Sequence, residues 1–377
     1  METVRFGIIG LGAQGSNYIL NIFDTNKLEN ATLTAVCDAF VASHDRIKSK
    51  VKNLQLEYFV DYKEMLDSGL VDAIIIVVPH FMHDEIACEA LKRNINVLCE
   101  KPASVYTKQA KAMNEAANAS KALYSMMFSQ RTMPIYQKAK EFVASGKLGQ
   151  IQRINWITTC WFRTQFYYNS GAWRATWKGE GGGILLNQAP HQLDLLQWII
   201  GEMPISVRAF ASYGKWHDIE VEDEVTAYLE YENGATGVFI SSTGENPGCN
   251  RFEVVGTKGK FVIDGNTFST YINEKDTLEF CKTEQTMFGA SPYTTNTEVI
   301  ADIGAQHIGV MQNFANAVLG KEKLLVEGVD GLNSMELING IALSGFKGGE
   351  KVNLPIDDDE YIRYLNEKIS SSKKTNN

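Results

Sequence analysis

The chain has 377 residues, of which 44% are hydrophobic and 21% are charged, and its net charge is −9. This composition is typical of a globular protein, and the length favours two domains over a single hydrophobic core. The negative charge, without any cluster of basic residues, argues against nucleic acid and anionic membrane surfaces as partners.

The six cysteines are scattered and lack the paired spacing of a zinc site or a disulfide framework, which favours a reducing compartment. The longest strongly apolar run, 73–79, is too short to span a bilayer, and no cationic segment precedes the first predicted strand. We therefore expect a cytoplasmic protein that is neither exported nor membrane-bound.

The first predicted strand, 4–9, leads directly into a glycine-rich turn, and a helix is predicted for 17–23. This is the context that a dinucleotide-binding G-x-G-x-x-G fingerprint requires, although a glycine-rich turn without a ligand is the alternative. We expect Gly10 to make the tight turn, Gly12 to let the backbone approach a pyrophosphate, and Gly15 to allow close helix packing. The predicted cofactor contacts in this turn are Gly10, Leu11, Gly12, Ala13, Gln14 and Gly15.

The second predicted strand, 32–37, ends at Asp38, at the distance where an acidic residue accepts the hydroxyl groups of an adenosine ribose. A carboxylate at this point repels a 2′-phosphate, and the next two residues offer no arginine to reverse that preference. Asp38 therefore predicts NAD as the cofactor. Arg46 lies further along the chain and leaves NADP as the less favoured choice.

A continuous apolar run, 71–78, is typical of a strand buried on both faces of a parallel sheet, and a helix is predicted for 84–93. His80 and His83 could suggest a metal site, but no further carboxylate or cysteine ligand is evident nearby, so we predict no metal. We expect Pro79, His80 and His83 to lie beside the cofactor, at the carboxyl edge of the sheet.

The next predicted strand, 95–99, delivers Glu100-Lys101-Pro102 to the same edge. Taken alone, a lysine before proline is more often a surface residue in a turn. A lysine at the mouth of a buried strand and beside a cofactor is instead a candidate catalyst. We expect Glu100 and Lys101 to contact the cofactor and Lys101 to be catalytic as well. A helix at 108–119 and a strand at 122–128 complete an alternating α/β domain.

From residue 129 the pattern changes to a helix at 134–145 followed by strand-like segments, with hairpin turns at 232–234 and 256–259. This predicts an α+β domain with a mostly antiparallel sheet. The expected strands are 151–160, 205–213, 224–230, 235–242, 251–255 and 260–263. Helices at 305–319 and 332–344 and a short strand near 352 are expected to close this domain.

The predicted organisation is a cofactor-binding domain at 1–128, a substrate-binding and oligomerisation domain at 129–369, and a disordered polar tail at 370–377.

Segment 161–180 is crowded with aromatic and cationic side chains outside any periodic pattern. Such residues are poor core material but suit the C–H faces and hydroxyl groups of a sugar. An oligomer or domain interface would use the same residue types. The candidate substrate-binding residues of this segment are Arg163, Tyr167, Trp173 and Arg174.

A triple glycine at 181–183 precedes a helix predicted over 184–196. Asn187, His191 and Asp194 are four and three residues apart, which places them on one face of such a helix. A lone helical histidine is usually structural, but the polar stripe, the preceding proline and the triple glycine favour a functional role. We expect His191 to be catalytic and Asn187 and Asp194 to bind substrate.

Together these motifs resemble the Gfo/Idh/MocA family of nicotinamide-dependent oxidoreductases. The motifs are Gly10-x-Gly12-x-x-Gly15, Pro79-His80-x-x-His83, Glu100-Lys101-Pro102 and Gly182-Gly183-x-x-x-Asn187-x-x-x-His191-x-x-Asp194. Their order and spacing match over nearly the whole chain. The resemblance implies an α/β Rossmann domain with a parallel sheet, followed by an α+β domain whose large, open-faced sheet serves oligomerisation, as a homodimer or homotetramer.

The resemblance also implies catalytic roles for Lys101 and His191, and sugars, cyclitols or their derivatives as substrates. Many members have an aspartate where Asn187 stands. An amide can orient a hydroxyl group but cannot take a proton, so more of the catalytic work falls to His191 and Lys101.

The leading functional hypothesis is NAD-dependent oxidation of a secondary alcohol on a sugar, glycoside or cyclitol, by hydride transfer to the nicotinamide. One alternative is a glycoside-cleaving enzyme that keeps NAD bound and uses transient oxidation and elimination. A second is a non-catalytic NAD-binding regulator, which would need neither Lys101 nor His191.

Overall fold

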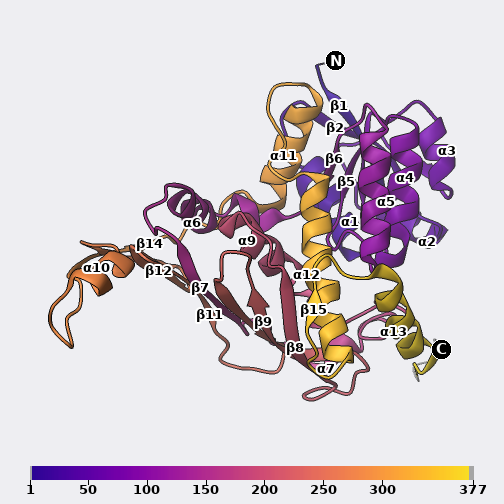
Figure 1. Ribbon diagram of the computed structural model, residues 1–377. Coiled ribbons are helices and arrows are strands. Elements are labelled where there is room, and N and C mark those ends of the chain that lie inside the picture. Colours follow the sequence, from indigo (N-terminus) through magenta and orange to yellow (C-terminus); the bar gives the residue numbers. More distant parts are fainter. Residues whose placement is uncertain (1, 373–377) are drawn as a thin grey trace. The chain divides into compact units, whose positions relative to one another are not determined.

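A computed structural model of the chain describes residues 2–372. It contains two compact units, each built on its own sheet (Figure 1). The first comprises residues up to Thr132 together with Ala305–Met335, and the second comprises Met133–Gly304 and the residues from Glu336 onward. Most of the tail predicted at 370–377 lies outside the described residues, but Ser370 ends helix α13 (Asp358–Ser370). No helix within 2–372 is long and apolar enough to cross a membrane.

The sheet of the first unit has six parallel strands in the order β3-β2-β1-β4-β5-β6. The strand order reverses between β1 and β4, which is where ligands bind in open α/β sheets. The strands are β1 (Val4–Ile9), β2 (Ala31–Cys37), β3 (Glu57–Phe59), β4 (Ala73–Ile76), β5 (Asn96–Cys99) and β6 (Tyr124–Met126). The helices between them include α1 (Ala13–Tyr18), α2 (Val41–Lys48), α3 (Tyr62–Asp67), α4 (His83–Lys92) and α5 (Thr107–Asn118).

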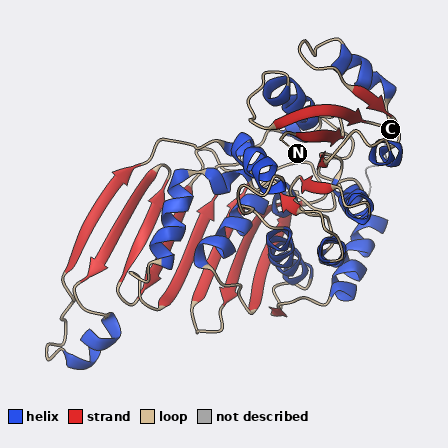
Figure 2. Cartoon of the chain, turned by 90° about the horizontal axis from the view of Figure 1, so that it is seen from above, coloured by secondary structure: helices blue, strands red, loops and turns tan. Residues whose placement is uncertain are grey.

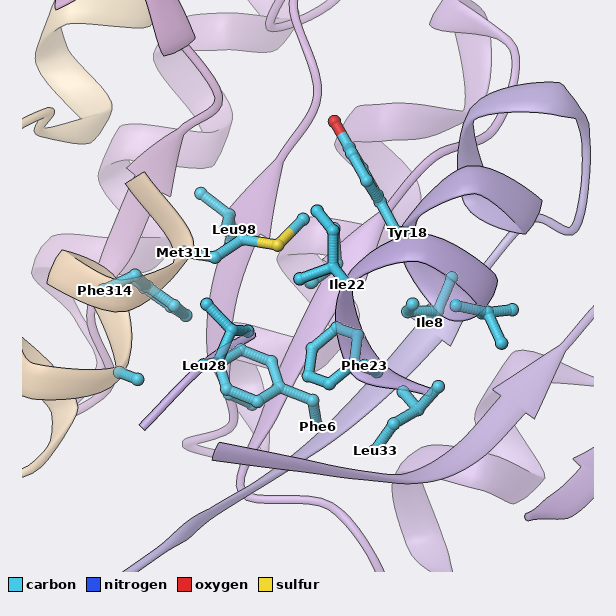
Figure 3. Packing of buried hydrophobic residues seen from close by; sticks show 14 of the residues in the cluster. Phe6, Ile8, Tyr18, Ile22, Phe23, Leu28, Leu33, Leu98, Met311 and Phe314 are labelled. Carbon is cyan, nitrogen blue, oxygen red and sulfur yellow. The ribbon is translucent and has the colours of Figure 1, made fainter. Parts of the chain in front are cut away.

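Helix α11 (Gln306–Val318) packs into the core of the first unit, although it follows all the long strands of the second unit in sequence. Its Met311 and Phe314 are fully buried in one cluster with Phe6 and Leu28 (Figure 3). The rings of Phe6 and Phe314 are 6.1 Å apart. The sequence predicts this helix, but its expected place in the second domain is wrong, because nothing local indicates which sheet it covers.

The second unit holds a nine-stranded sheet in the order β14-β13-β12-β11-β7-β10-β9-β8-β15, with the strands side by side in one long layer (Figure 2). Among the described strands of this sheet, only β7 and β10 pair in parallel, which confirms the predicted mostly antiparallel sheet. Burial alternates along β9, as expected for a sheet with one covered face. The strands that the sequence predicted for this unit are present, with the bounds β7 (Ile151–Thr158), β8 (Ser206–Tyr213), β9 (Glu222–Glu230), β10 (Thr236–Ser242), β11 (Asn250–Gly256), β12 (Gly259–Asp264) and β15 (Val352–Asn353).

The sequence analysis missed the elements at one edge of this sheet. This edge consists of β13 (Thr267–Asn273), α10 (Thr277–Thr283) and β14 (Tyr293–Val299), none of which was predicted. Every residue of β14 is exposed, so no buried face imposes an alternating pattern on the strand. Other helices of the unit include α6 (Pro134–Ala144), α7 (Gln165–Tyr168) and the later part of α12 (Gly328–Phe346).

The single helix predicted over 184–196 is wrong, because the structure has two helices there. Helix α8 (Ile184–Asn187) ends before Ala189, and α9 (Pro190–Ile200) begins at the proline. Proline has no N–H for a helical hydrogen bond but is well suited to the first position of a new helix. Asn187 and His191 therefore do not share the face of one continuous helix, whereas His191 and Asp194 both lie on α9.

Replacing Phe314 with alanine tests the packing of α11 into the first unit. Because the ring is fully buried, we expect Phe314→Ala to lower the free energy of unfolding by roughly 3–5 kcal/mol. The matched control is Phe288→Ala, since that ring is 95% exposed and its loss should cost less than about 0.5 kcal/mol. Equal effects of the two variants in chemical denaturation would contradict the packing.

Candidate functional site

The glycine turn after β1 combines two crowded positions with one open position. Gly10 has φ +99°, and a Cβ there would lie 2.3 Å from the carbonyl oxygen of Val77. A Cβ on Gly15 would lie 2.0 Å from the carbonyl oxygen of Gly10, so helix and turn pack as closely as predicted. A Cβ on Gly12 would meet nothing within 4 Å. The turn is therefore rigid, with its backbone accessible at Gly12.

Asp38 is tied to the glycine turn through its carboxylate. Its Oδ2 accepts the backbone N–H of Leu11 at 2.8 Å, and its Oδ1 accepts that of Phe40 at 2.9 Å. Arg46 reaches the same turn, because its Nη2 donates to the carbonyl oxygen of Leu11. A carboxylate and a guanidinium group thus both lie beside the turn.

Glu100 fixes the start of the loop that carries Lys101. The hydroxyl of Tyr18 donates to Oε1 of Glu100, and the backbone N–H of Lys101 donates to Oε2 at 3.2 Å. Burial and the charge of Glu100 raise the pKa of Tyr18 well above its usual value, so the hydroxyl keeps its proton. Lys101 follows β5 at the same edge of the sheet as the glycine turn.

His83, predicted beside the cofactor, is fully buried as a bridge between two loops. Its Nδ1 is 2.9 Å from the carbonyl oxygen of Pro102, and its Nε2 is 2.9 Å from that of Val78. Burial lowers the pKa of His83, although the two carbonyl groups favour protonation. The ring of His80 lies 5.9 Å away. Within residues 2–372, no group of three or more His, Cys, Asp or Glu side chains is placed to hold a metal ion.

His307 belongs to this part of the molecule, and sequence reasoning missed it. It lies on α11, and its ring is 5.5 Å from that of Tyr18. Burial lowers the pKa of His307, Glu100 opposes this shift and Lys101 adds to it. More than 200 residues separate His307 from the motifs it joins, so only the packing of α11 could reveal it.

In the second unit, four predicted substrate residues form a contiguous stack. Nη1 of Arg174 donates to the Tyr167 hydroxyl at 2.9 Å, and its Cζ lies 4.6 Å from the centre of that ring. The same guanidinium lies 4.5 Å from the Trp173 ring, and that of Arg163 lies 5.1 Å from the Tyr167 ring. The structure thus brings Arg163, Tyr167, Trp173 and Arg174 together, as a cluster of cationic and aromatic faces.

Other aromatic residues of the segment 161–180 are core residues, contrary to the expectation that the segment is poor core material. Tyr168 and Trp177 are each only 5% exposed. The Trp177 ring packs 5.7 Å from Tyr213 and 5.7 Å from Phe346, which lie on β8 and α12. The local pattern does not separate these rings from the stacked ones, because their partners are distant in sequence.

The loop carrying Arg163 is held through both the backbone N–H group and the carbonyl oxygen of this residue. The N–H of Arg163 donates to the carbonyl oxygen of Thr243 at 3.0 Å, and its own carbonyl oxygen lies 2.8 Å from Nε2 of His217. Nδ1 of His217 is 3.1 Å from Oδ2 of Asp223, which is fully buried. Sequence analysis did not identify His217 or Asp223.

Asn187 is joined to the stack through Tyr167 and to a buried acid through its amide group. Its Oδ1 lies 3.4 Å from the Tyr167 hydroxyl, and its Nδ2 donates to Oε1 of Glu180. Oε2 of Glu180 accepts the backbone N–H of Ala175 at 2.6 Å. Glu180 was not predicted, although its position directly before the triple glycine was a usable signal.

The two predicted residues on α9 differ in accessibility. His191 is half-buried in the first turn of the helix. Asp194 is fully buried, and Nε2 of Gln197 donates to its Oδ1 at 3.3 Å. The burial of Asp194 favours a supporting role within the unit over direct contact with a substrate.

Glu222 holds the triple-glycine turn from β9. Its Oε1 accepts the N–H groups of Gly183 at 2.9 Å and Leu185 at 3.1 Å. A Cβ on Gly183 would lie 2.0 Å from the carbonyl oxygen of Glu222, so this glycine admits the β9 backbone. Burial raises the pKa of Glu222 to about 7, and the charge of Glu180 adds to the shift, while the two N–H bonds oppose it.

A change of pH should show the raised pKa of Glu222. A carboxyl group whose pKa is higher in the folded state stabilises the fold at low pH, and this contribution is lost as the pH rises through about 7. We expect Glu222→Gln to unfold like the wild type at pH 5 and to be more stable than it by on the order of 1–3 kcal/mol at pH 8. A stability difference between the two proteins that does not vary with pH would contradict this assignment.

Two family profiles match the chain. One, described as "Oxidoreductase family, NAD-binding Rossmann fold", matches residues 4–128. The other, described as "GFO/IDH/MocA C-terminal domain", matches residues 136–262. Between them they take in the glycine turn, Lys101, the stacked cluster and His191.

Individual proteins similar to the chain include scyllo-inositol 2-dehydrogenase (NAD(+)) of Bacillus subtilis, which is 24% identical over 94% of this chain and 97% of its own length. D-glucoside 3-dehydrogenase of Escherichia coli is 25% identical over 92% of this chain and 96% of its own. Among solved structures, the WlbA dehydrogenase from Chromobacterium violaceum, in complex with NADH and UDP-GlcNAcA, has a TM-score of 0.79. It is 24% identical and covers 95% of this chain and 97% of its own, which shows a shared fold.

Proposed function

Because the chain belongs to the Gfo/Idh/MocA oxidoreductase family, we propose that it is an NAD-dependent dehydrogenase acting on a secondary alcohol of a sugar, glycoside or cyclitol. The observation that carries the proposal is the arrangement at the carboxyl edge of the parallel sheet. There the open Gly12 backbone, the Asp38 carboxylate and the Lys101 loop follow β1, β2 and β5 of one sheet. This edge is where dinucleotides bind in such sheets.

The residues at this edge fit a dinucleotide. Gly12 leaves room for a phosphate group close to the backbone, and Asp38 retains lone pairs that can accept ribose hydroxyl groups. A carboxylate also disfavours the additional phosphate of NADP, which supports NAD. When bound, NAD supplies the acceptor for the hydride.

In the proposed reaction, His191 accepts the proton of the substrate hydroxyl group. Its place in the first turn of α9 suits a neutral imidazole, because the positive end of a helix dipole disfavours a second positive charge. Lys101 donates a hydrogen bond to the same oxygen and stabilises the negative charge that develops on it. Glu100 holds the backbone of Lys101, so the ammonium group extends from a fixed loop.

The stacked cluster supports a polyhydroxylated substrate. Aromatic faces bind the C–H faces of a sugar ring, while guanidinium groups donate hydrogen bonds to its hydroxyl groups. Two of the similar relatives are named for an inositol and a glucoside, and one similar structure holds a nucleotide sugar. We infer the class of substrate from this agreement.

The direct test is a screen of sugars, glycosides and inositols with NAD, followed by the absorbance of NADH. Net NADH formation with a polyol supports the dehydrogenase. Release of free sugar from a glycoside without NADH would instead indicate the cleaving reaction. No turnover of any polyol, together with tight binding to a protein partner, would indicate a regulator.

Loss of the Lys101 ammonium group should reduce catalysis far more than cofactor binding. We expect Lys101→Ala to lower kcat by about 100-fold or more on a substrate found in the screen, since a positioned acid contributes typically 10²–10⁴-fold. NAD affinity, measured by titration of protein fluorescence, should change less than about 5-fold. Near-full turnover in this variant would rule out the assigned role.

Removing the Asp38 carboxylate should weaken the preference for NAD. In Asp38→Ser the acceptor of the ribose hydroxyl groups and the repulsion of a 2′-phosphate both decrease, while Arg46 remains beside the turn. We expect the ratio of kcat/KM for NAD to kcat/KM for NADP to fall by about 10-fold or more. An unchanged ratio would show that Asp38 does not select the cofactor.

A further inference from the structure

The buried carboxylate of Glu180 joins two segments that carry candidate substrate residues. Its two oxygens accept hydrogen bonds from the amide of Asn187 and from the backbone N–H of Ala175. Ala175 follows Arg174 and has φ +53°, a conformation that residues other than glycine rarely adopt unless their surroundings hold them. Glu180 itself is 3% exposed. One side chain thus sets the spacing between Asn187 and the Arg174 loop.

Glu180 also determines which way the Asn187 amide points. A carboxylate only accepts hydrogen bonds, so Asn187 turns its NH2 group towards Glu180 and its oxygen away from it. That oxygen lies 3.4 Å from the Tyr167 hydroxyl and 3.2 Å from Nε2 of Gln188, both of which can donate. Asn187 therefore presents an acceptor on the side of the stacked cluster.

We propose that Glu180 is a positioning residue, which holds Asn187 so that its Oδ1 accepts a hydrogen bond from a hydroxyl group of the substrate in place of the long, 3.4 Å bond from Tyr167. This inference rests on the proposed function, because it takes a polyol as the substrate. Within this pair Glu180 is the acid, and Asn187 provides a neutral acceptor that Glu180 orients. Glu180 acts through Asn187 and, by way of Ala175, through the Arg174 loop.

The inference predicts that acid and amide can be exchanged within the pair. In Glu180→Gln an NH2 group replaces one of the two oxygens that accept separately from Asn187 and Ala175, so one of these hydrogen bonds is lost. In Asn187→Asp two carboxylates face each other and repel. In the double variant Glu180→Gln/Asn187→Asp, the glutamine oxygen can accept from Ala175 while its NH2 group donates to the new aspartate. The hydrogen bond from Ala175 is then kept, and the one between residues 180 and 187 is restored with its direction reversed.

The experiment measures kcat, KM and the unfolding temperature of the wild type, both single variants and the double variant. The probes are myo-inositol, scyllo-inositol, D-glucose and methyl β-D-glucoside with NAD, and the best wild-type substrate is used for the series. We expect kcat/KM to fall about 10-fold in Glu180→Gln and about 100-fold in Asn187→Asp, chiefly through KM. The double variant should recover to within about 5-fold of the wild type. Glu224→Gln, an acid on the same strand as Glu222 that pairs with Lys215, is the matched control and should remain like the wild type.

If the fold-decrease in kcat/KM of the double variant equals the product of the fold-decreases of the two single variants, the inference is overturned. Recovery of the unfolding temperature without recovery of KM would also overturn it, because the pair would then support the fold alone. Wild-type protein that forms no NADH with any probe would count against the proposed function instead. In that case the unfolding temperatures test whether Glu180 and Asn187 act as a pair. A decrease in the double variant that equals the sum of the decreases in the two single variants would overturn the inference.

Discussion

In each of the two units, carboxylates that accept hydrogen bonds from the backbone hold the loops that carry candidate site residues. Asp38 accepts from the glycine turn, Glu100 from Lys101, Glu180 from Ala175, and Glu222 from the triple-glycine turn. Hydrogen bonds to a charged acceptor are stronger than those to a neutral one, and a buried charge left without such partners is costly. Each acid therefore restrains the loop that donates to it, and Asp38 and Glu222 do so from a distant segment of the chain.

These acids explain why the loops need glycine and tolerate an unusual backbone. The triple-glycine turn approaches β9 so closely that a Cβ on Gly183 would collide with the carbonyl group of Glu222. Ala175 keeps a positive φ because Glu180 engages its N–H group. Burial of Glu222 raises its pKa, and the charge of Glu180 adds to this shift.

Local pattern was sufficient where neighbouring residues decide the structure. Periodicity and turn chemistry predict the strand, glycine turn and helix at the start of the chain. They also predict the apolar run of β4 and the hairpins of the second sheet. Pattern failed for the helix over 184–196, where Pro190 starts a second helix, and for β14, which is exposed along its whole length. The first failure was avoidable, because Pro190 lacks the N–H group that a continuous helix would need at this position.

The sequence by itself determined the two sheets, the dinucleotide turn with Asp38, and the candidate roles of Lys101 and His191, because these depend on spacing along the chain. Only the tertiary structure decided that α11 brings His307 to Tyr18. It also decided that Trp177 is a core residue while Trp173 stacks on Arg174. The hydrogen bond by which Glu180 orients Asn187 is a third such outcome. Those outcomes depend on which distant segments pack together. The free energy of such packing comes from burial and from hydrogen bonds between segments, and neither leaves a periodic trace in the sequence.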